Sequence, residues 1–267
     1  MIWDVGISTV LVVVMFAAAV LYRSAYLHRK KVWNLSVQQV INLIIIPGII
    51  FPFVYAYLRS VQQLPRNPYA FFPDALLVNI ILLAFMFAYG GTAIHAVTKM
   101  MSVYLRQEKG DLAEVNRFFH LQFSHTLSYA GALVAFMGLV LLELNHLPAG
   151  DKGSLVWGVI KAVGLGLAVL LGMRGYTRNF GDDYQGRWRD LRLVFLVFWV
   201  GFIFFLLGVR RLRPELTDYQ LLLPAVGVFG VMILLSTVLV VRRVGRGWQV
   251  RVQSKALEQY FRREDVD

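Results

Sequence analysis

Long apolar segments, each bounded by charged residues, constrain the fold of this chain more than any other feature. Seven such segments of 17 to 24 residues cover positions 5–22, 37–58, 75–95, 121–144, 155–173, 193–209 and 221–241. A helix needs roughly 20 apolar residues to cross about 30 Å of hydrocarbon. Backbone polar groups inside a bilayer must also be bonded within the protein, which favours helices. We therefore predict an all-α, polytopic integral membrane protein with a bundle of seven transmembrane helices.

The composition excludes several classes of protein. Hydrophobic residues make up 58% of the chain and charged residues 16%, whereas soluble domains carry about 25% charged residues. The absence of cysteine excludes disulfides, thiolate metal sites, iron–sulfur clusters and cysteine nucleophiles. The net charge of +11 lies largely in short segments beside the apolar spans. This pattern favours membrane lipids with anionic headgroups as partners. Binding of nucleic acid is not expected.

The basic residues predict the orientation of the chain. Twenty lysines and arginines lie on one side of the seven predicted spans, and six lie on the other. Because cytoplasmic loops carry the excess of lysine and arginine, the N-terminus is expected outside and the C-terminus in the cytoplasm. The expected location is a cytoplasmic (inner) membrane of bacterial type. Residues 1–246 form the predicted transmembrane domain, and 247–267 form a basic amphipathic cytoplasmic tail.

Three histidines lie near the predicted cytoplasmic ends of the third and fourth spans. They are His95, His120 and His125, and imidazoles at this depth can bind haem iron or a transition metal, or relay protons. Residues five apart on an α-helix point about 140° apart. We therefore expect at most one of His120 and His125 to face His95. The alternative is that all three are interfacial histidines bonded to neighbouring groups or lipid headgroups.

Two ionisable residues lie near the opposite surface. Glu143 closes the fourth span, and Lys161 lies about 9 Å into the fifth. A charged group within a span is costly and needs a partner, and the ten-residue connection makes the two helices neighbours. We predict an ion pair between Glu143 and Lys161. The alternative is that Lys161 extends its own stem to the surface.

The fifth span carries two rows of small residues at a spacing of four. Rows of this kind allow helices to approach closely in lipid. Two rows predict two close neighbours, which would place this helix at the centre of the bundle or at a subunit interface. The predicted packing residues are Gly158, Ala162, Gly164, Gly166, Ala168 and Gly172.

Two further surfaces are candidate sites. The paired carboxylates of Asp182 and Asp183 could bind Mg²⁺ or a diphosphate, although aromatic residues and arginines around them also fit an ordinary headgroup belt. Basic residues of the last outer loop and of the tail predict a surface for lipid or for a protein partner. They are Arg210, Arg211, Arg213, Arg251, Lys255, Arg262 and Arg263.

Three functions follow from these features. The first is a non-enzymatic membrane subunit, a scaffold or receptor-like component of a complex with other membrane subunits or with copies of itself. The second is a channel or transporter for a small solute or ion. The third is a haem- or metal-dependent membrane enzyme, for redox chemistry or lipid modification. The first is preferred because no set of residues in the sequence has the spacing of a catalytic site, and no cofactor is assigned.

Overall fold

The computed structural model describes residues 6–21, 24–32, 35–70, 72–105, 110–148, 154–178 and 187–245. Helices dominate this part of the chain. The predicted metal residues Asp182 and Asp183 lie outside the described residues, and so does the predicted tail 247–267 with Arg251, Lys255, Arg262 and Arg263.

The elements follow one another as helices joined by short connections. The elements are α1 (Ile7–Leu21), α2 (Ala25–Arg29), β1 (Lys31–Val32), β2 (Leu35–Ser36), α3 (Val37–Val40), the π turn η2 (Ile41–Ile45), α4 (Ile46–Gln62), α5 (Asp74–Tyr104), α6 (Asp111–Phe118), the π turn η3 (Phe119–Phe123), α7 (Ser124–Leu144), α8 (Leu155–Arg178), α9 (Arg187–Leu212) and α10 (Leu222–Gly245). Elements α3, η2 and α4 form one continuous helix, Val37–Gln62. Elements α6, η3 and α7 form a second and longer one, Asp111–Leu144. Each of these two helices contains a π-helical turn.

Six helices of the described chain are long and apolar enough to cross a membrane. They cover Val37–Gln62, Asp74–Ser102, Asp111–Leu144, Leu155–Met173, Arg192–Leu212 and Leu222–Val241. The prediction of an all-α bundle of apolar helices is confirmed, and these helices indicate an integral membrane protein. The first predicted span is shorter, because α1 has 15 residues and is therefore about 22 Å long.

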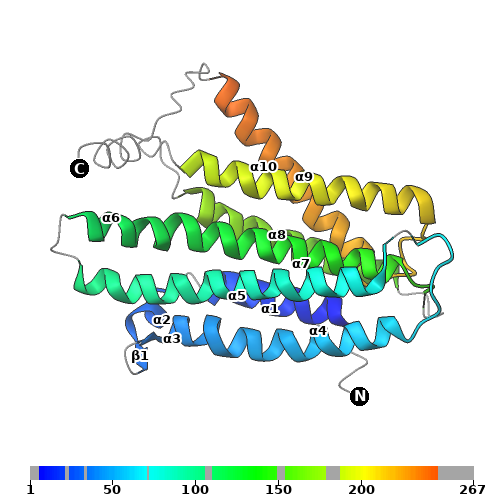
Figure 1. Ribbon diagram of the computed structural model, residues 1–267, viewed down its shortest axis with the longest axis horizontal. Helices are drawn as coiled ribbons and strands as arrows, with labels where there is room; N and C mark the ends of the chain where they lie inside the picture. The colour runs from blue at the N-terminus through cyan, green and yellow to red at the C-terminus, as the bar shows by residue number, and fades with distance from the viewer. Residues whose placement is uncertain are drawn as a thin grey trace, which may run out of the picture.

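The bundle has two ends of different construction (Figure 1). At the right of Figure 1, residues 63–70 after α4, residues 145–148 after α7 and the α9–α10 connection meet. There, the Asn67 N–H donates to the Asn145 carbonyl at 2.7 Å, and the Leu147 N–H donates to the Pro65 carbonyl at 2.8 Å. We call this the clasp end. The opposite end carries α2, the two-stranded β1–β2 ribbon, the end of α5 and the start of α6, and we call it the histidine end.

Helices α5 and α7 pack closely side by side, antiparallel, along the middle of the bundle (Figure 1). Glycine makes this approach possible at two positions. A Cβ atom on Gly91 would lie 2.6 Å from the Ser124 carbonyl oxygen, and one on Gly131 would lie 2.7 Å from the Ala84 carbonyl oxygen. A side chain at either position would push α5 and α7 apart, so these two glycines allow the short distance between the helices.

The small residues of α8 lie against two different helices. A Cβ atom on Gly166 would lie 3.1 Å from the Gly227 carbonyl oxygen of α10, and one on Gly164 would lie 2.8 Å from Val12 of α1. The structure also places Gly158 against Leu223, Gly172 near Tyr129, and the Ala162 carbonyl beside Gly227, while Ala168 is buried. The opposite face of α8 is exposed, as Trp157 and Val163 show. Helix α8 therefore has two close neighbours but lies at the periphery of the bundle.

Phenylalanines of α9 and α10 form part of the core of the bundle. Phe205 and Phe229 meet edge to face with ring centroids 4.8 Å apart, and Phe198 and Phe202 stack at 5.7 Å. Phe198 and Phe229 are almost fully buried. These rings form a buried aromatic cluster between α9 and α10.

Candidate functional site

The three histidines of the histidine end form one cluster. The His95 ring stacks on His120 with centroids 4.4 Å apart and planes 19° apart. The centroid of His125 lies 4.7 Å from that of His95. The prediction that at most one of His120 and His125 could face His95 is therefore wrong.

A π-helical turn is the physical reason. In η3 the Ser124 N–H bonds to the Phe119 carbonyl, five residues back, and not to that of His120, four residues back. The wider turn adds one residue to the helical repeat, so that residues five apart return to nearly the same face. It also frees the His120 carbonyl, which accepts a hydrogen bond from the Ser124 hydroxyl at 2.6 Å and faces His95 Nδ1 at 3.3 Å.

The hydrogen bonds of the cluster fix the proton on each ring. A carbonyl oxygen can only accept, so the contact with the His120 carbonyl places a hydrogen on His95 Nδ1. The Thr98 hydroxyl donates its single hydrogen to a backbone carbonyl, that of Ile94 at 2.7 Å. Its oxygen is then an acceptor for His120 Nδ1 at 3.1 Å. Both rings are therefore Nδ1–H tautomers.

His125 follows the same rule. Its Nδ1 lies 2.8 Å from the Leu121 carbonyl and donates to it. A neutral ring with its hydrogen on Nδ1 carries its lone pair on Nε2, and the Nε2 of His95 is buried without a hydrogen-bond partner. A histidine whose Nδ1–H is held by a carbonyl is the usual form of a metal-binding imidazole. However, no three His, Asp or Glu side chains in the described ranges are arranged to hold a metal ion.

Polar residues of three helices surround the cluster. The amide of Asn116 donates to the Thr98 carbonyl at 3.1 Å and to the Ser102 hydroxyl at 3.0 Å. Its Oδ1 is buried without a partner, so it is a second unsatisfied acceptor in this region. Lys99 reaches from α5 to the Gln38 side chain of α3 at 3.2 Å. The histidine end therefore holds buried acceptors that no group of the described chain donates to.

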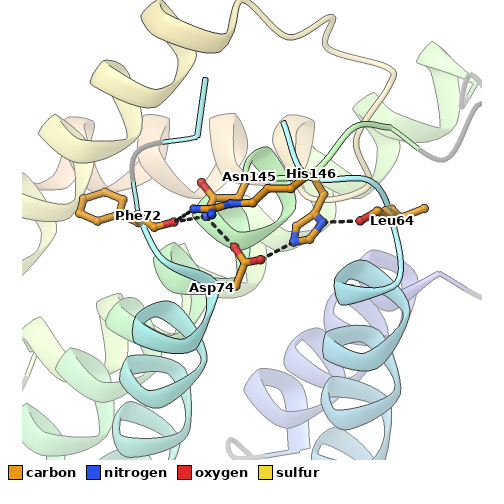
Figure 2. Close-up of polar contacts among 6 residues, drawn as sticks. Leu64, Phe72, Asp74, Asn145 and His146 are labelled. Atoms are coloured by element: carbon orange, nitrogen blue, oxygen red, sulfur yellow. Dashed lines mark hydrogen bonds and ion pairs between the residues drawn. The ribbon is translucent and has the colours of Figure 1, made fainter. Parts of the chain in front are cut away.

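The clasp end is built around the pair of Asp74 and His146 (Figure 2). The ring of His146 is 3% exposed; its Nε2 lies 3.1 Å from Asp74 Oδ2, and its Nδ1 lies 2.8 Å from the Leu64 carbonyl. Both partners accept hydrogen bonds when Asp74 is ionised, so both ring nitrogens carry hydrogen. The geometry fits an imidazolium–carboxylate ion pair, and together with the Leu64 contact it joins the α4–α5 connection and the start of α5 to the residues that follow α7.

The remaining polar groups of the clasp are also bonded. Asn145 donates to Asp74 Oδ1 at 2.9 Å and to the Phe72 carbonyl at 2.8 Å, and Arg66 donates to that same carbonyl (Figure 2). The buried Glu143 accepts the backbone N–H groups of Gln220 at 2.7 Å and Leu221 at 2.9 Å. We use the name clasp for Arg66, Asp74, Glu143, Asn145, His146 and Tyr219, whose hydroxyl donates to the His146 carbonyl at 3.2 Å.

The structure gives Glu143 and Lys161 different hydrogen-bond partners. Glu143 turns toward the backbone before α10, and Lys161 donates to the Ser8 hydroxyl of α1 at 2.9 Å. The two side chains are not in direct contact, and a functional coupling between them stays a prediction. Of the predicted basic surface, Arg210, Arg211 and Arg213 are described, and all three are exposed at the clasp end.

Sequence reasoning missed Asp74, Asn145 and His146. Asp74 stands at the start of a helix and the other two stand in a short connection, and residues in such places are most often solvated. No model of a known protein family matches this chain, and the searches of curated proteins and of solved structures gave no match. The interpretation of both ends therefore rests on their geometry.

Proposed function

We propose that the protein is a multi-pass membrane subunit without enzymatic activity, a scaffold or receptor-like component that assembles with other membrane subunits or with itself. The observation that carries this proposal is how the ionisable groups within the spans are bonded. Lys161, Lys99 and Glu143 each bond to a neighbouring element of the bundle. They join neighbouring elements, and phenylalanines of α9 and α10 pack against one another in the core.

We further propose seven crossings, with the N-terminus outside and the C-terminus in the cytoplasm. The start of α1 lies at the clasp end, because Gly6 adjoins Gln220. Ser8 and Val12 then pack against Lys161 and Gly164 along α8, and the chain continues into α2 at the histidine end (Figure 1). This path supports α1 as a short seventh span. The excess of lysine and arginine at the histidine end supports its cytoplasmic location.

The chain has no cysteine, so single introduced cysteines report topology without background. Cysteines at Ile2 and Leu147 are expected to react with an impermeant reagent from outside the cell, and a cysteine at Ser254 only after the membrane is opened. Labelling of Ile2 and Ser254 from the same side would reject the seventh crossing. Labelling of Leu147 from the inside would reject the orientation.

Purification in a mild detergent tests the subunit proposal. The expected result is a particle heavier than the 30.4 kDa chain by a whole number of copies or by a co-purifying membrane protein. A monomer that conducts ions or a solute after reconstitution into liposomes would reject it in favour of a channel or transporter.

A haem- or metal-dependent enzyme is the second candidate, and the histidine cluster favours it. The three imidazoles lie together, and the Nε2 of His95 is buried without a hydrogen-bond partner. A haem iron needs only one such axial ligand. Absorption near 400 nm in the purified protein, lost in a His95→Ala variant but kept in His146→Ala, would establish this function and reject the first one.

A further inference from the structure

A small pocket lies at the clasp end between the first turns of α8 and the segment that leads into α10. Its volume is about 100 Å³, the share of about three water molecules in the liquid. The residues that line it include Ser154, Trp157, Lys161, Thr217, Asp218 and Gln220. This space admits a few polar atoms of a ligand but not a whole lipid or a haem.

The pocket combines one cation and one anion. Lys161 has three N–H donors, and its hydrogen bond in the structure goes to Ser8 at 2.9 Å. Glu143, its predicted partner, is bonded to two backbone N–H groups instead. The lysine therefore retains donors for a negatively charged group, while Asp218 on the same pocket wall offers a carboxylate to a positively charged one.

The surface beside the pocket is apolar and exposed. On α8, Val156 is 68% exposed, Trp157 65% and Ile160 50%, and Leu216 across the pocket is 51% exposed. Apolar side chains on a membrane-spanning helix face acyl chains, and tryptophan favours the headgroup level. A ligand that enters this pocket from the bilayer would thus have a polar head and an apolar body.

We propose that this pocket binds the headgroup of a phospholipid that carries a phosphodiester and a primary ammonium. The phosphate bonds to Lys161, the ammonium bonds to Asp218, and the acyl chains lie on the exposed face of α8. A headgroup with only negative charge would be repelled by Asp218. A quaternary ammonium has no N–H to donate to that carboxylate. The inference rests on the membrane location of the bundle and not on its function as a subunit.

Native mass spectrometry of the purified full chain with added lipids tests this proposal. The probes are phosphatidylethanolamine, phosphatidylcholine, phosphatidylglycerol and soluble phosphoethanolamine. We expect phosphatidylethanolamine to be retained best, and soluble phosphoethanolamine to compete with it at higher concentration. Lys161→Met should weaken retention about tenfold, the usual effect of losing one charge-assisted hydrogen bond. Asp218→Asn should remove the preference over phosphatidylcholine while leaving binding of phosphate-containing lipids in place.

Arg210→Met is the matched control, because it removes an exposed cation of the same end that does not line the pocket. It is expected to retain lipid as the unaltered chain does. Equal retention of the three phospholipids by the unaltered chain would overturn the proposal. So would an Arg210→Met variant that loses as much lipid as Lys161→Met. If Lys161→Met fails to fold, Asp218→Asn still tests the proposal. An Asp218→Asn variant that keeps its preference for phosphatidylethanolamine over phosphatidylcholine would contradict the assigned site.

Discussion

The two polar ends of the bundle satisfy their buried groups to different degrees. At the clasp end, His146 uses both ring nitrogens, Asp74 uses both oxygens and Glu143 accepts two backbone N–H groups. At the histidine end, His95 Nε2 and Asn116 Oδ1 are buried without partners, whereas at the clasp end the hydroxyl of Tyr57, near Glu143, is the one such side-chain atom of the described chain. A fully bonded buried network stabilises the fold, whereas unsatisfied buried groups are costly. We infer from this comparison that the clasp is mainly structural, and ligand binding at the histidine cluster stays a prediction.

The largest expected effect is at the clasp. Asp74→Ala removes the carboxylate that His146 and Asn145 share, and it leaves the buried Nε2 of His146 without its partner. Breaking such a pair costs about 3 kcal/mol, which a detergent-denaturation curve followed by circular dichroism can measure. Glu114→Ala, an exposed carboxylate at the other end, should change the free energy of unfolding by less than about 0.5 kcal/mol. If Asp74→Ala unfolds no more easily than Glu114→Ala, the clasp does not stabilise the fold.

The second effect tests how the histidine end is held together. Gly91→Ala should cost about 2 kcal/mol, because its Cβ would lie 2.6 Å from the Ser124 carbonyl oxygen and force α5 away from α7. Gly90 is the matched control, since nothing lies within 4 Å of a Cβ there. Gly90→Ala should be neutral or stabilise the helix by up to about 1 kcal/mol. Equal effects of the two substitutions on the denaturation midpoint would argue against backbone contact at this end.

The third effect concerns Tyr219 and depends on pH. Tyr219→Phe removes the hydrogen bond to the His146 carbonyl and should cost about 1 kcal/mol at neutral pH. Burial, followed by the negative charges of Glu143 and Asp218, raises the pKa of the Tyr219 phenol above its ordinary value of 10.0.

A raised folded-state pKa means that the unfolded chain ionises this phenol first. The contribution to stability is then complete below about pH 10 and is lost as the pH rises through the folded pKa. The unaltered protein should therefore lose its advantage over Tyr219→Phe above pH 10. Two denaturation series, at pH 8 and pH 10.5, measure this. A difference that stays constant across that range would contradict the raised pKa.

The fold was predictable because its main signal is local. The length of each apolar segment can be read directly from the sequence, and six of the seven predicted spans are helices long enough to cross a membrane. The rows of Gly158 and Gly164 likewise predicted two close neighbours for α8, although only the structure shows which helices these are.

The site was less predictable because it depends on non-local contacts. In a regular α-helix the side chains of His120 and His125 would point in different directions. The sequence has no signal for the π turn that brings both of them to His95. Asp74 and His146 are 72 residues apart, one at the start of α5 and the other just after α7, and the packing of the whole bundle brings them together. Local patterns therefore predicted the helices, while the polar contacts between connections required the three-dimensional structure.

The smallest expected change in the free energy of unfolding is that of His95→Leu. It gives the most direct comparison, because the same substitution can be made at the other end, at His146. His146→Leu removes two hydrogen bonds and strands the Asp74 carboxylate, and should cost about 3 kcal/mol. His95→Leu removes one long hydrogen bond of 3.3 Å together with a buried acceptor that has no donor. Replacing an unsatisfied buried group with an apolar one of similar size is nearly neutral. We therefore expect His95→Leu to shift the free energy of unfolding by no more than about 0.5 kcal/mol, measured in the same detergent series. A loss at His95 as large as that at His146 would mean that the histidine cluster is a second structural network and not a binding site.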